Sequence, residues 1–296
     1  MNNKTSLNGF SAAIAQKIAD YKLLVKLGLS NLVVFSAGIA FLMGQDKSID
    51  WGGLMLLCVG GYLVTWAANA LNQVIEKDYD KLMTRTAVRP LATGRMETTE
   101  AVLAAGLMSV AGILVFAIFF NPLTAFLAVI SLLSYAFVYT PMKRVSPVSV
   151  WIGAIPGALP MMIGYAAATG SVGLGGWILF TIQFLWQFPH FWAIGWVGYE
   201  DYQKGGFKML PSVNGRDRET ALQCVIYAFA LLPASVLPYW SGMSGIWSLV
   251  VLSIMAIFYT YKAIVLYLKL DNASARSLMF ASFFYLPIAL LALLFL

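Results

Sequence analysis

Residues 72–95 read NQVIEKDYDKLMTRTAVRPLATGR, and this polar stretch interrupts a sequence that is otherwise mostly apolar. Asn72, Glu76 and Asp80 recur every four residues, so on a helix each lies about 40° from the next and all three share one face. Asp78 falls on roughly the opposite side of such a helix. The stretch therefore predicts one amide and two carboxylates gathered on one helical face, directly after an apolar run.

Two arginines follow these oxygen-bearing side chains at short range. Arg85 comes five residues after Asp80, Arg89 four residues later, and Pro90 ends any helix there. Amide and carboxylate oxygens suit Mg²⁺, which bridges phosphate oxygens, and guanidinium groups bind such oxygens bidentately. We therefore predict a Mg²⁺–diphosphate site. The alternative is a solvated, salt-bridged helix face without chemistry. Ionisable groups at the mouth of a membrane helix favour the functional interpretation.

The composition places the chain in a membrane. Of its 296 residues 60% are hydrophobic and 11% charged, and apolar runs long enough to cross a bilayer core of roughly 30 Å recur throughout. Backbone groups in lipid must be satisfied internally, which requires helices. We expect an all-α polytopic membrane protein in which nine transmembrane helices surround a central cavity that opens to the cytoplasmic side. The predicted spans are 22–43, 52–71, 98–119, 122–140, 147–168, 175–197, 220–239, 245–267 and 276–296.

The basic residues predict the orientation of the chain. With nine spans nearly every Lys and Arg falls on the side of the N-terminus, and only Lys47 lies on the other. The positive-inside rule then puts the N-terminus in the cytoplasm, or in the matrix of an organelle, and the C-terminus outside. We expect a bacterial cytoplasmic (inner) membrane. The net charge of +6 follows from this bias and gives no argument for nucleic acid binding.

Two regions are expected in this chain. Residues 1–21 are mildly amphipathic and are predicted to lie at the cytoplasmic interface, with a disordered tail as the alternative. Residues 22–296 are predicted to form a single nine-helix domain. Within it, the span 147–168 carries three glycines and two prolines, which fit close helix contacts and a kinked cavity wall.

The fourth span ends on the cytoplasmic side in YAFVYTPMKR, residues 135–144. Tyr139 and Arg144 are placed where they can approach a ligand at the mouth of the cavity. Lys143 has two interpretations, a diphosphate ligand or a residue that only follows the positive-inside rule.

A second polar stretch follows the sixth span and reads WQFPHFWAIGWVGYEDYQKGGFKMLP, residues 186–211. His190 is the only histidine, and Trp192 is one of the tryptophans around it. A lone histidine in a membrane helix is usually a hydrogen-bonded packing residue, but an aromatic setting also suits a flat macrocycle or its metal. Glu200 and Asp201 form a second acidic cluster with Lys204 nearby. Two oxygen clusters at one mouth can hold two Mg²⁺ ions on one diphosphate.

Together these motifs resemble the UbiA superfamily of intramembrane prenyltransferases, and within it the subgroup that farnesylates haem. The superfamily pattern is an Asn-x-x-x-Asp-x-x-x-Asp motif after the second span and another acidic motif after the sixth. The subgroup signature matches at Asp80, Met83, Arg85-Thr86, Arg89-Pro90-Leu91, Thr93-Gly94, Tyr139-Thr140-Pro141, Lys143-Arg144, Pro189-His190-Phe191-Trp192, Asp201-Tyr202 and Met209-Leu210-Pro211.

The resemblance implies farnesyl transfer from farnesyl diphosphate to a vinyl group of haem b, with addition of water, to give haem O. Mg²⁺ is the implied cofactor, haem b is a substrate, and the downstream haem A synthase or terminal oxidase is an implied partner. The implied catalytic residues are Asn72, Glu76, Asp80 and Asp201, which with Glu200 are also the implied metal ligands. The implied diphosphate ligands are Arg85, Arg89, Lys143, Arg144 and Lys204, and the implied haem contacts are His190, Trp192 and Tyr139.

Two departures from the superfamily pattern bear on the metal. Glu76 stands where the family usually has Asp, which keeps a carboxylate one methylene further out. Gly205 stands four residues after Asp201, so the second Asp-x-x-x-Asp motif is incomplete, and Glu200 is the candidate substitute.

Three other functions compete with this one. A related enzyme with a quinone-precursor acceptor would not need the PHFW motif. A transporter would place charges near the bilayer midplane and show repeat symmetry. A haem-handling protein without catalysis would leave Asn72, Glu76 and Asp80 unexplained.

Overall fold

The computed structural model describes residues 2–45 and 48–296, and the regular elements within these ranges are all helical. In chain order they are α1 (Asn2–Leu24), α2 (Leu27–Met43), α3 (Trp51–Asp80), α4 (Thr98–Phe119), α5 (Pro122–Leu133), the π-helix η1 (Ser134–Tyr139), α6 (Thr140–Val145), α7 (Ser149–Thr169), α8 (Gly173–Val197), α9 (Tyr199–Lys204), α10 (Arg218–Trp240), α11 (Ile246–Lys269) and α12 (Asn272–Phe295). The expected all-α membrane class is confirmed.

The number of spans is less settled than the class. Within the described ranges, seven helices are long and apolar enough to cross a membrane, counting α5, η1 and α6 as one continuous run. An eighth is added if α1 and α2, which meet at 51°, form one broken span. All nine predicted ranges fall on helices, but α2 has only 17 residues and α8 carries polar Gln183, Gln187 and His190. Nine spans therefore stay a prediction.

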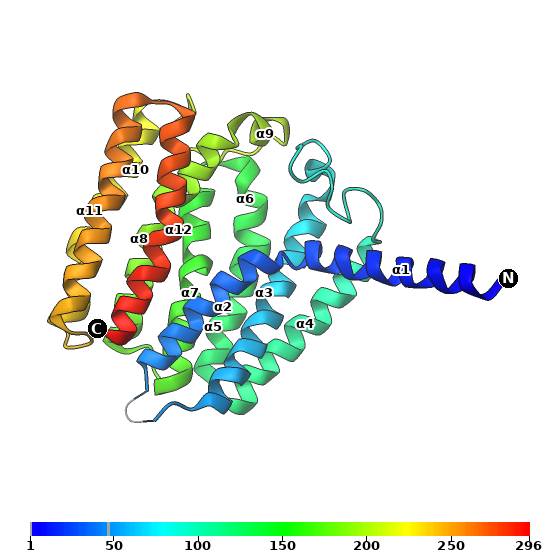
Figure 1. The fold of residues 1–296 in the computed structure, drawn as a ribbon, viewed down its shortest axis with the longest axis horizontal. Coiled ribbons are helices and arrows are strands. Elements are labelled where there is room, and N and C mark those ends of the chain that lie inside the picture. The colour runs from blue at the N-terminus through cyan, green and yellow to red at the C-terminus, as the bar shows by residue number, and fades with distance from the viewer. Residues whose placement is uncertain (1, 46–47) are drawn as a thin grey trace.

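The helices form a bundle with α7 and α8 at its centre. α7 packs against α2, α5 and α8, while α8 also packs against α10 and α12. Figure 1 shows α3 and α4 on one side of this centre and α10 and α11 on the other. α2 and α12, which are distant in sequence, are neighbours.

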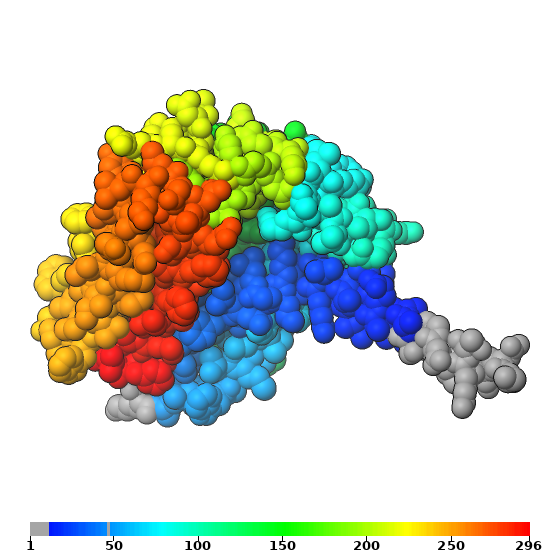
Figure 2. Space-filling model, turned by 45° about the horizontal axis from the view of Figure 1, so that its top comes forward, coloured from blue at the N-terminus to red at the C-terminus, as the bar shows by residue number. Residues whose placement is uncertain are grey.

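The two polar stretches lie at the same end of the bundle. In Figure 1 the loop at 81–97 (cyan), α9 and the turn between α11 and α12 are at the top, and the C-terminus is at the bottom. Figure 2 turns this end toward the viewer and shows the surface hollowed between the loop at 81–97, α9 and α12. The fold thus brings together, at one mouth, segments more than a hundred residues apart.

α1 leaves the bundle on one side and is tied to it by polar contacts (Figure 1). The Lys17 Nζ and Tyr21 Oη atoms donate to the Glu100 carboxylate of α4 at 2.6 and 2.8 Å. Asp20, which is buried, accepts from Arg95 Nε at 2.9 Å. The helix continues past residue 21 to Leu24, so the expected boundary between residues 21 and 22 is not a helix boundary. The interfacial location of residues 1–21 stays a prediction.

The two prolines predicted to kink the cavity wall lie inside α7, which is one uninterrupted helix. Pro160 has no N–H for the Pro156 carbonyl one turn earlier, and Ser131 Oγ of α5 donates to that oxygen at 3.4 Å. The wall is also closely packed, because a Cβ atom at Gly153 would lie 2.5 Å from the Tyr139 ring. A Cβ at Gly164 would collide with the Ala37 carbonyl of α2. The glycines predicted to permit close helix contacts therefore have that role.

Candidate active site

The last three turns of α3 carry the predicted oxygen ligands. Asn72, Glu76 and Asp80 are all buried, whereas Asp78 is exposed and pairs with Lys81 at 2.9 Å. The period of four therefore placed the three side chains on one inward face, as predicted, and excluded Asp78. α3 ends at Asp80, and the loop at 81–97 then turns back over the site.

Both buried carboxylates are paired with cations that come from different segments. Lys143 Nζ of α6 lies 2.5 Å from Glu76 Oε1. Arg89 Nη1 lies 2.7 Å from Asp80 Oδ2, and 3.9 Å from Glu76 Oε2. Arg89 and Lys143, predicted as diphosphate ligands, are thus brought to the carboxylates. We call these four residues, together with Asn72 and Lys26, the ion cluster.

Lys26 completes the ion cluster and was missed as a site residue in the sequence. Its Nζ donates to Asn72 Oδ1 at 2.6 Å, while Asn72 Nδ2 donates to Thr140 Oγ1 at 3.1 Å. The signal available in the sequence was a lysine between Val25 and Leu27 at the start of an apolar run. The same signal is expected from the positive-inside rule alone, so it did not single out Lys26.

Asp201 lies next to the loop that carries the arginines. Its Oδ1 accepts from the backbone N–H of Thr84 at 2.7 Å, and its Oδ2 from that of Arg85 at 3.1 Å. Partial burial raises the pKa of Asp201, but the hydrogen bonds from Arg85 and Thr84 outweigh it and hold the pKa below its usual value. Lys204 Nζ lies 3.5 Å from the same carboxylate and donates to Thr84 Oγ1 at 3.3 Å.

Glu200 does not join Asp201. Its exposed carboxylate forms a bidentate pair with Arg216, at 2.5 and 2.6 Å, and this hydrogen bonding lowers its pKa. In the described ranges no group of three or more His, Cys, Asp or Glu side chains is arranged to hold a metal. The oxygen donors that do converge are the Asn72 amide and the Glu76 and Asp80 carboxylates.

Two further predicted arginines face aromatic rings at the mouth. Arg85 is exposed. Its Nη2 atom lies 3.3 Å from Tyr202 Oη, and its guanidinium group lies 5.7 Å from the centroid of the Tyr202 ring. The Arg144 guanidinium lies 3.7 Å from the centroid of Tyr79. Neither forms an ion pair with Glu76 or Asp80, whose described partners are Arg89 and Lys143.

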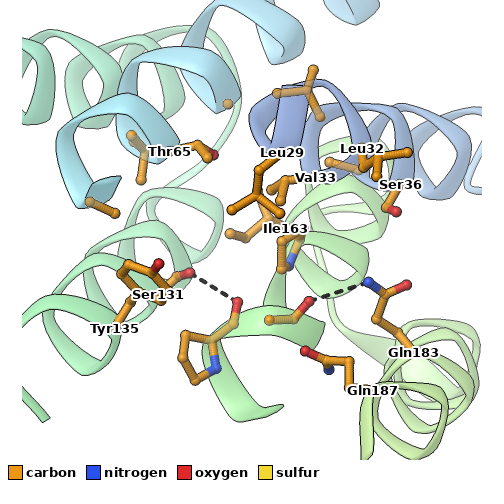
Figure 3. Close-up of a pocket in the computed structure, with 18 of the residues that line it drawn as sticks. Leu29, Leu32, Val33, Ser36, Thr65, Ser131, Tyr135, Ile163, Gln183 and Gln187 are labelled. Atoms are coloured by element: carbon orange, nitrogen blue, oxygen red, sulfur yellow. Dashed lines mark hydrogen bonds between the residues drawn. The ribbon is translucent and has the colours of Figure 1, made fainter. Parts of the chain in front are cut away.

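A large, mostly apolar cavity lies beside the ion cluster, between α2, α3, α7, α8 and α12. Its empty volume, which includes its open mouth, is about 1440 Å³. Tyr139 lines it and also lies under Lys143, whose Nζ is 4.8 Å from the ring centroid. Figure 3 shows the cavity between Leu29 and Leu32 on one side and Gln183 and Gln187 on the other.

His190 and Trp192 lie on different sides of α8. His190 lines the cavity, stacked on Trp186 with ring centroids 4.7 Å apart. Trp192 is fully buried against Trp151 and Tyr227 and does not line the cavity. The structure therefore brings His190 and Tyr139, but not Trp192, to the cavity of the predicted haem site.

A hydrogen-bond chain anchors the His190 ring. His190 Nδ1 lies 2.6 Å from Ser282 Oγ, which also lies 2.5 Å from the Met279 carbonyl oxygen. This contact occupies Nδ1, so Nε2 is the ring nitrogen that Ser282 leaves unengaged.

The fold and the site define an all-helical membrane protein with a buried carboxylate–cation cluster at the mouth of an apolar cavity. The model of the UbiA prenyltransferase family matches residues 32–286. The chain belongs to this family and is a prenyltransferase.

Relatives agree with this assignment, and solved structures share the fold. A protoheme IX farnesyltransferase of Cytophaga hutchinsonii is 43% identical over 279 residues, which cover 94% of this chain and 98% of the relative. A structure of digeranylgeranylglyceryl phosphate synthase matches with a TM-score of 0.77 at 20% identity, covering 94% of this chain and 98% of the other. A UbiA homologue from Archaeoglobus fulgidus, bound to DMAPP and Mg²⁺, matches with a TM-score of 0.68 at 15% identity, covering 94% and 100%. These two structures establish the fold alone.

Proposed function

We propose that this chain transfers a farnesyl group from farnesyl diphosphate to a vinyl group of haem b, with Mg²⁺ as cofactor and haem O as product. The proposal is supported by the relatives of 42–43% identity, which are named protoheme IX farnesyltransferases. In the reaction the C1–O bond of the farnesyl group breaks and its electron pair leaves with the diphosphate. The vinyl group supplies the electrons of the new C–C bond, and water adds to the remaining cationic carbon with loss of a proton.

One observation carries the proposal: a cluster of basic side chains around two buried carboxylates adjoins an apolar cavity. Lys26, Arg89 and Lys143 surround Glu76 and Asp80 in the ion cluster. Tyr139 connects the two parts, because Lys143 lies over its ring while the ring also lines the cavity. A ligand with a polyanionic head and a hydrocarbon tail, such as farnesyl diphosphate, fits this combination.

The residues of the ion cluster fit Mg²⁺ together with diphosphate. Asn72, Glu76 and Asp80 offer hard oxygen donors on one helical face, the kind that Mg²⁺ prefers. Arg89 and Lys143, which pair with the carboxylates, are the proposed ligands of the phosphate oxygens. Bound Mg²⁺ would supply positive charge to the departing diphosphate. Asp201 is proposed to act by positioning the loop of Arg85, and Glu200, paired with Arg216, contributes less.

The cavity is proposed to hold the haem and the farnesyl chain away from water. Its apolar, aromatic lining suits both, and no nucleophile is needed there, since aromatic faces stabilise an allylic cation without trapping it. His190 Nε2 is proposed to contact the haem iron or an axial water, and Tyr139 to face the reacting carbon. Trp192, buried outside the cavity, would support the wall behind His190.

The membrane setting is proposed from the charge distribution. Basic loops at the end of the bundle that carries the ion cluster indicate a cytoplasmic mouth in a bacterial inner membrane, with the C-terminus outside. Reporters fused after Leu296 and within 205–215 should report opposite faces. The downstream haem A synthase or terminal oxidase is the proposed partner that receives the product.

The decisive experiment is to incubate purified protein with haem b, farnesyl diphosphate and Mg²⁺ and to analyse the haem by mass spectrometry. A hydroxyethylfarnesyl haem is the expected product, and it should not form when Mg²⁺ is removed by chelation. A parallel reaction with an aromatic quinone precursor tests the competing acceptor. Prenylation of the quinone precursor with unchanged haem b would reject the proposal.

A further inference from the structure

The chain breaks between α1 and α2 at Lys26, which has a left-handed backbone conformation with φ of 49°. Among the non-glycine residues that the structure describes, only Leu270 shares a positive φ. For such a residue this conformation costs roughly 1–2 kcal/mol, so other interactions must hold it. The two helices meet there at 51°.

Side-chain amides of α3 hold this break in place. Asn69 Nδ2 donates to the Val25 carbonyl at 3.2 Å, and Gln73 Nε2 donates to the carbonyls of Leu23 and Leu24 at 2.8 and 2.9 Å. These carbonyls belong to the end of α1, where a helix leaves its last acceptors unsatisfied. The break is therefore a built feature of the α1–α3 contact, and it directs the residue at position 26 toward α3.

The ammonium group of Lys26 reaches the centre of the ion cluster but meets no carboxylate there. Its Nζ donates to Asn72 Oδ1 at 2.6 Å, and Asn72 is neutral. The carboxylates of the cluster are paired with Arg89 and Lys143. Among the residues for which side chains are described, no acid forms an ion pair with Lys26. Lys26 is thus the basic side chain of the ion cluster that has no acid partner among the described side chains.

We propose that Lys26 binds an oxygen of the diphosphate group of the prenyl substrate, as a third cation beside Arg89 and Lys143. The inference rests on the proposed function, since it assigns a residue to the substrate of that reaction. Lys26 has only to swing from the Asn72 oxygen to a phosphate oxygen, for which an ammonium group is a suitable point charge. The same movement frees Asn72 Oδ1 as an oxygen donor. Because the negative charge on the diphosphate grows as the C1–O bond breaks, the contact strengthens toward the transition state.

Because the backbone at position 26 is left-handed, a glycine substitution can remove the Lys26 side chain without disturbing the break between α1 and α2. Lys26→Gly removes the ammonium group and favours the positive φ, because glycine adopts this conformation without strain. Lys26→Met removes the charge but keeps a long apolar side chain, and Lys26→Arg keeps the charge. Leu270→Gly is the matched control, because it makes the same backbone change at the end of α11. Each purified variant is titrated with inorganic diphosphate, with farnesyl diphosphate in the presence of Mg²⁺, and with haem b, and its Tm is measured.

We expect Lys26→Gly and Lys26→Met to bind both diphosphates at least about tenfold more weakly than the native protein, since the lost contact is charge-assisted. Lys26→Gly should keep the native Tm and haem affinity, and Lys26→Arg should keep most of the diphosphate affinity. Leu270→Gly should change neither the diphosphate affinity nor the haem affinity. Undiminished diphosphate binding by Lys26→Gly would overturn the assignment, as would an equal loss of haem and diphosphate affinity. A native protein that binds farnesyl diphosphate through Lys26 but leaves haem b unchanged would instead reject the proposed function.

Discussion

Asp201 accepts a hydrogen bond from the backbone N–H of Arg85 at 3.1 Å, so an acid of the second polar stretch holds the loop that carries the arginines of the first. The companion bond from the Thr84 N–H makes the carboxylate a clamp on two successive peptide groups. This contact explains why two segments so distant in sequence form one mouth. It is also the contact on which the proposed positioning role of Asp201 rests.

Replacing Asp201 by Asn should loosen this loop. The variant removes the charge from two backbone hydrogen bonds, worth about 1.5–3 kcal/mol each when one partner is charged. We expect a several-fold higher KM for farnesyl diphosphate and faster hydrogen exchange at the amides of Thr84 and Arg85. Glu200→Gln is the control, since an exposed ion pair contributes at most about 1 kcal/mol, and equal effects of the two substitutions would contradict the clamp.

The pH dependence of the same contact has a definite sign. The pKa of Asp201 is lowered in the folded protein, so the carboxylate stabilises the fold at pH values above its unfolded pKa of about 3.9. That stabilisation is lost as the pH falls through the lower, folded pKa. Amide protection at Thr84 and Arg85, corrected for intrinsic exchange rates, should therefore stay constant between about pH 5 and 8. A loss of protection near pH 6 would show that another group controls the loop.

Substitutions of the buried acids of α3 should reduce turnover far more than substitution of the exposed Asp78. Glu76→Gln and Asp80→Asn each remove a buried carboxylate beside a buried cation, and we expect losses of at least about a hundredfold in kcat with haem binding retained. Asp78→Asn, at an exposed pair with Lys81, should be nearly neutral. Glu76→Asp should keep substantial activity because it retains the carboxylate. Comparable losses at Asp78 and Asp80 would contradict the buried face.

Substitutions of the two arginines in the loop should also differ in their effects on the kinetics. Arg89 contacts both oxygens of Asp80 and is largely buried, whereas Arg85 is exposed beside Tyr202. Lysine does not reproduce the geometry of a guanidinium group, so Arg89→Lys should lower kcat/KM for farnesyl diphosphate by about tenfold or more. Arg85→Lys should act mainly on KM and more mildly. A selective loss of haem binding in Arg85→Lys would instead place Arg85 at the haem propionates.

Substitution of His190 should change haem binding without changing diphosphate binding. We expect His190→Ala to weaken haem binding while farnesyl diphosphate still binds with native affinity. Ligation of iron by Nε2 further requires that the haem absorption spectrum change in this variant. Ser282→Ala, which removes the hydrogen-bond partner of His190 Nδ1, should change the spectrum partially. Trp192→Phe is the control, because this substitution lies outside the cavity. Unchanged haem binding in His190→Ala would show that His190 is a packing residue.

Sequence periodicity was sufficient for the inward face of α3. Asn72, Glu76 and Asp80 were placed together because polar residues on an apolar background mark a face clearly, and Asp78 was excluded for the same reason. On α8 the polar residues Gln183, Gln187 and His190 recur at spacings of four and three, and they mark the cavity side in the same way. Trp192 lies off this face, and it was grouped with His190 because the PHFW motif holds both residues and not because of periodicity.

Other parts of the site depended on tertiary contacts that leave no local pattern. The pairing of Glu200 with Arg216 requires the loop after α9 to fold back, and no spacing rule indicates it. The break at Lys26 has neither glycine nor proline, and it exists because Asn69 and Gln73 on another helix satisfy its carbonyls. The number of spans was uncertain for a related reason: Gln183, Gln187 and His190 serve the cavity and make α8 less apolar.

The close packing of α7 limits how this cavity can be redesigned. A methyl group at Gly157 would collide with the Gln187 amide, which is itself bonded to the Ala154 carbonyl at 3.0 Å, and one at Gly153 would strike Tyr139. Engineering for a bulkier or smaller acceptor is therefore blocked along α7. The opposite wall, with Leu29 and Leu32 on α2, has exposed aliphatic side chains that can be exchanged without breaking a hydrogen bond. A library directed at α2 offers the practical route to new acceptors.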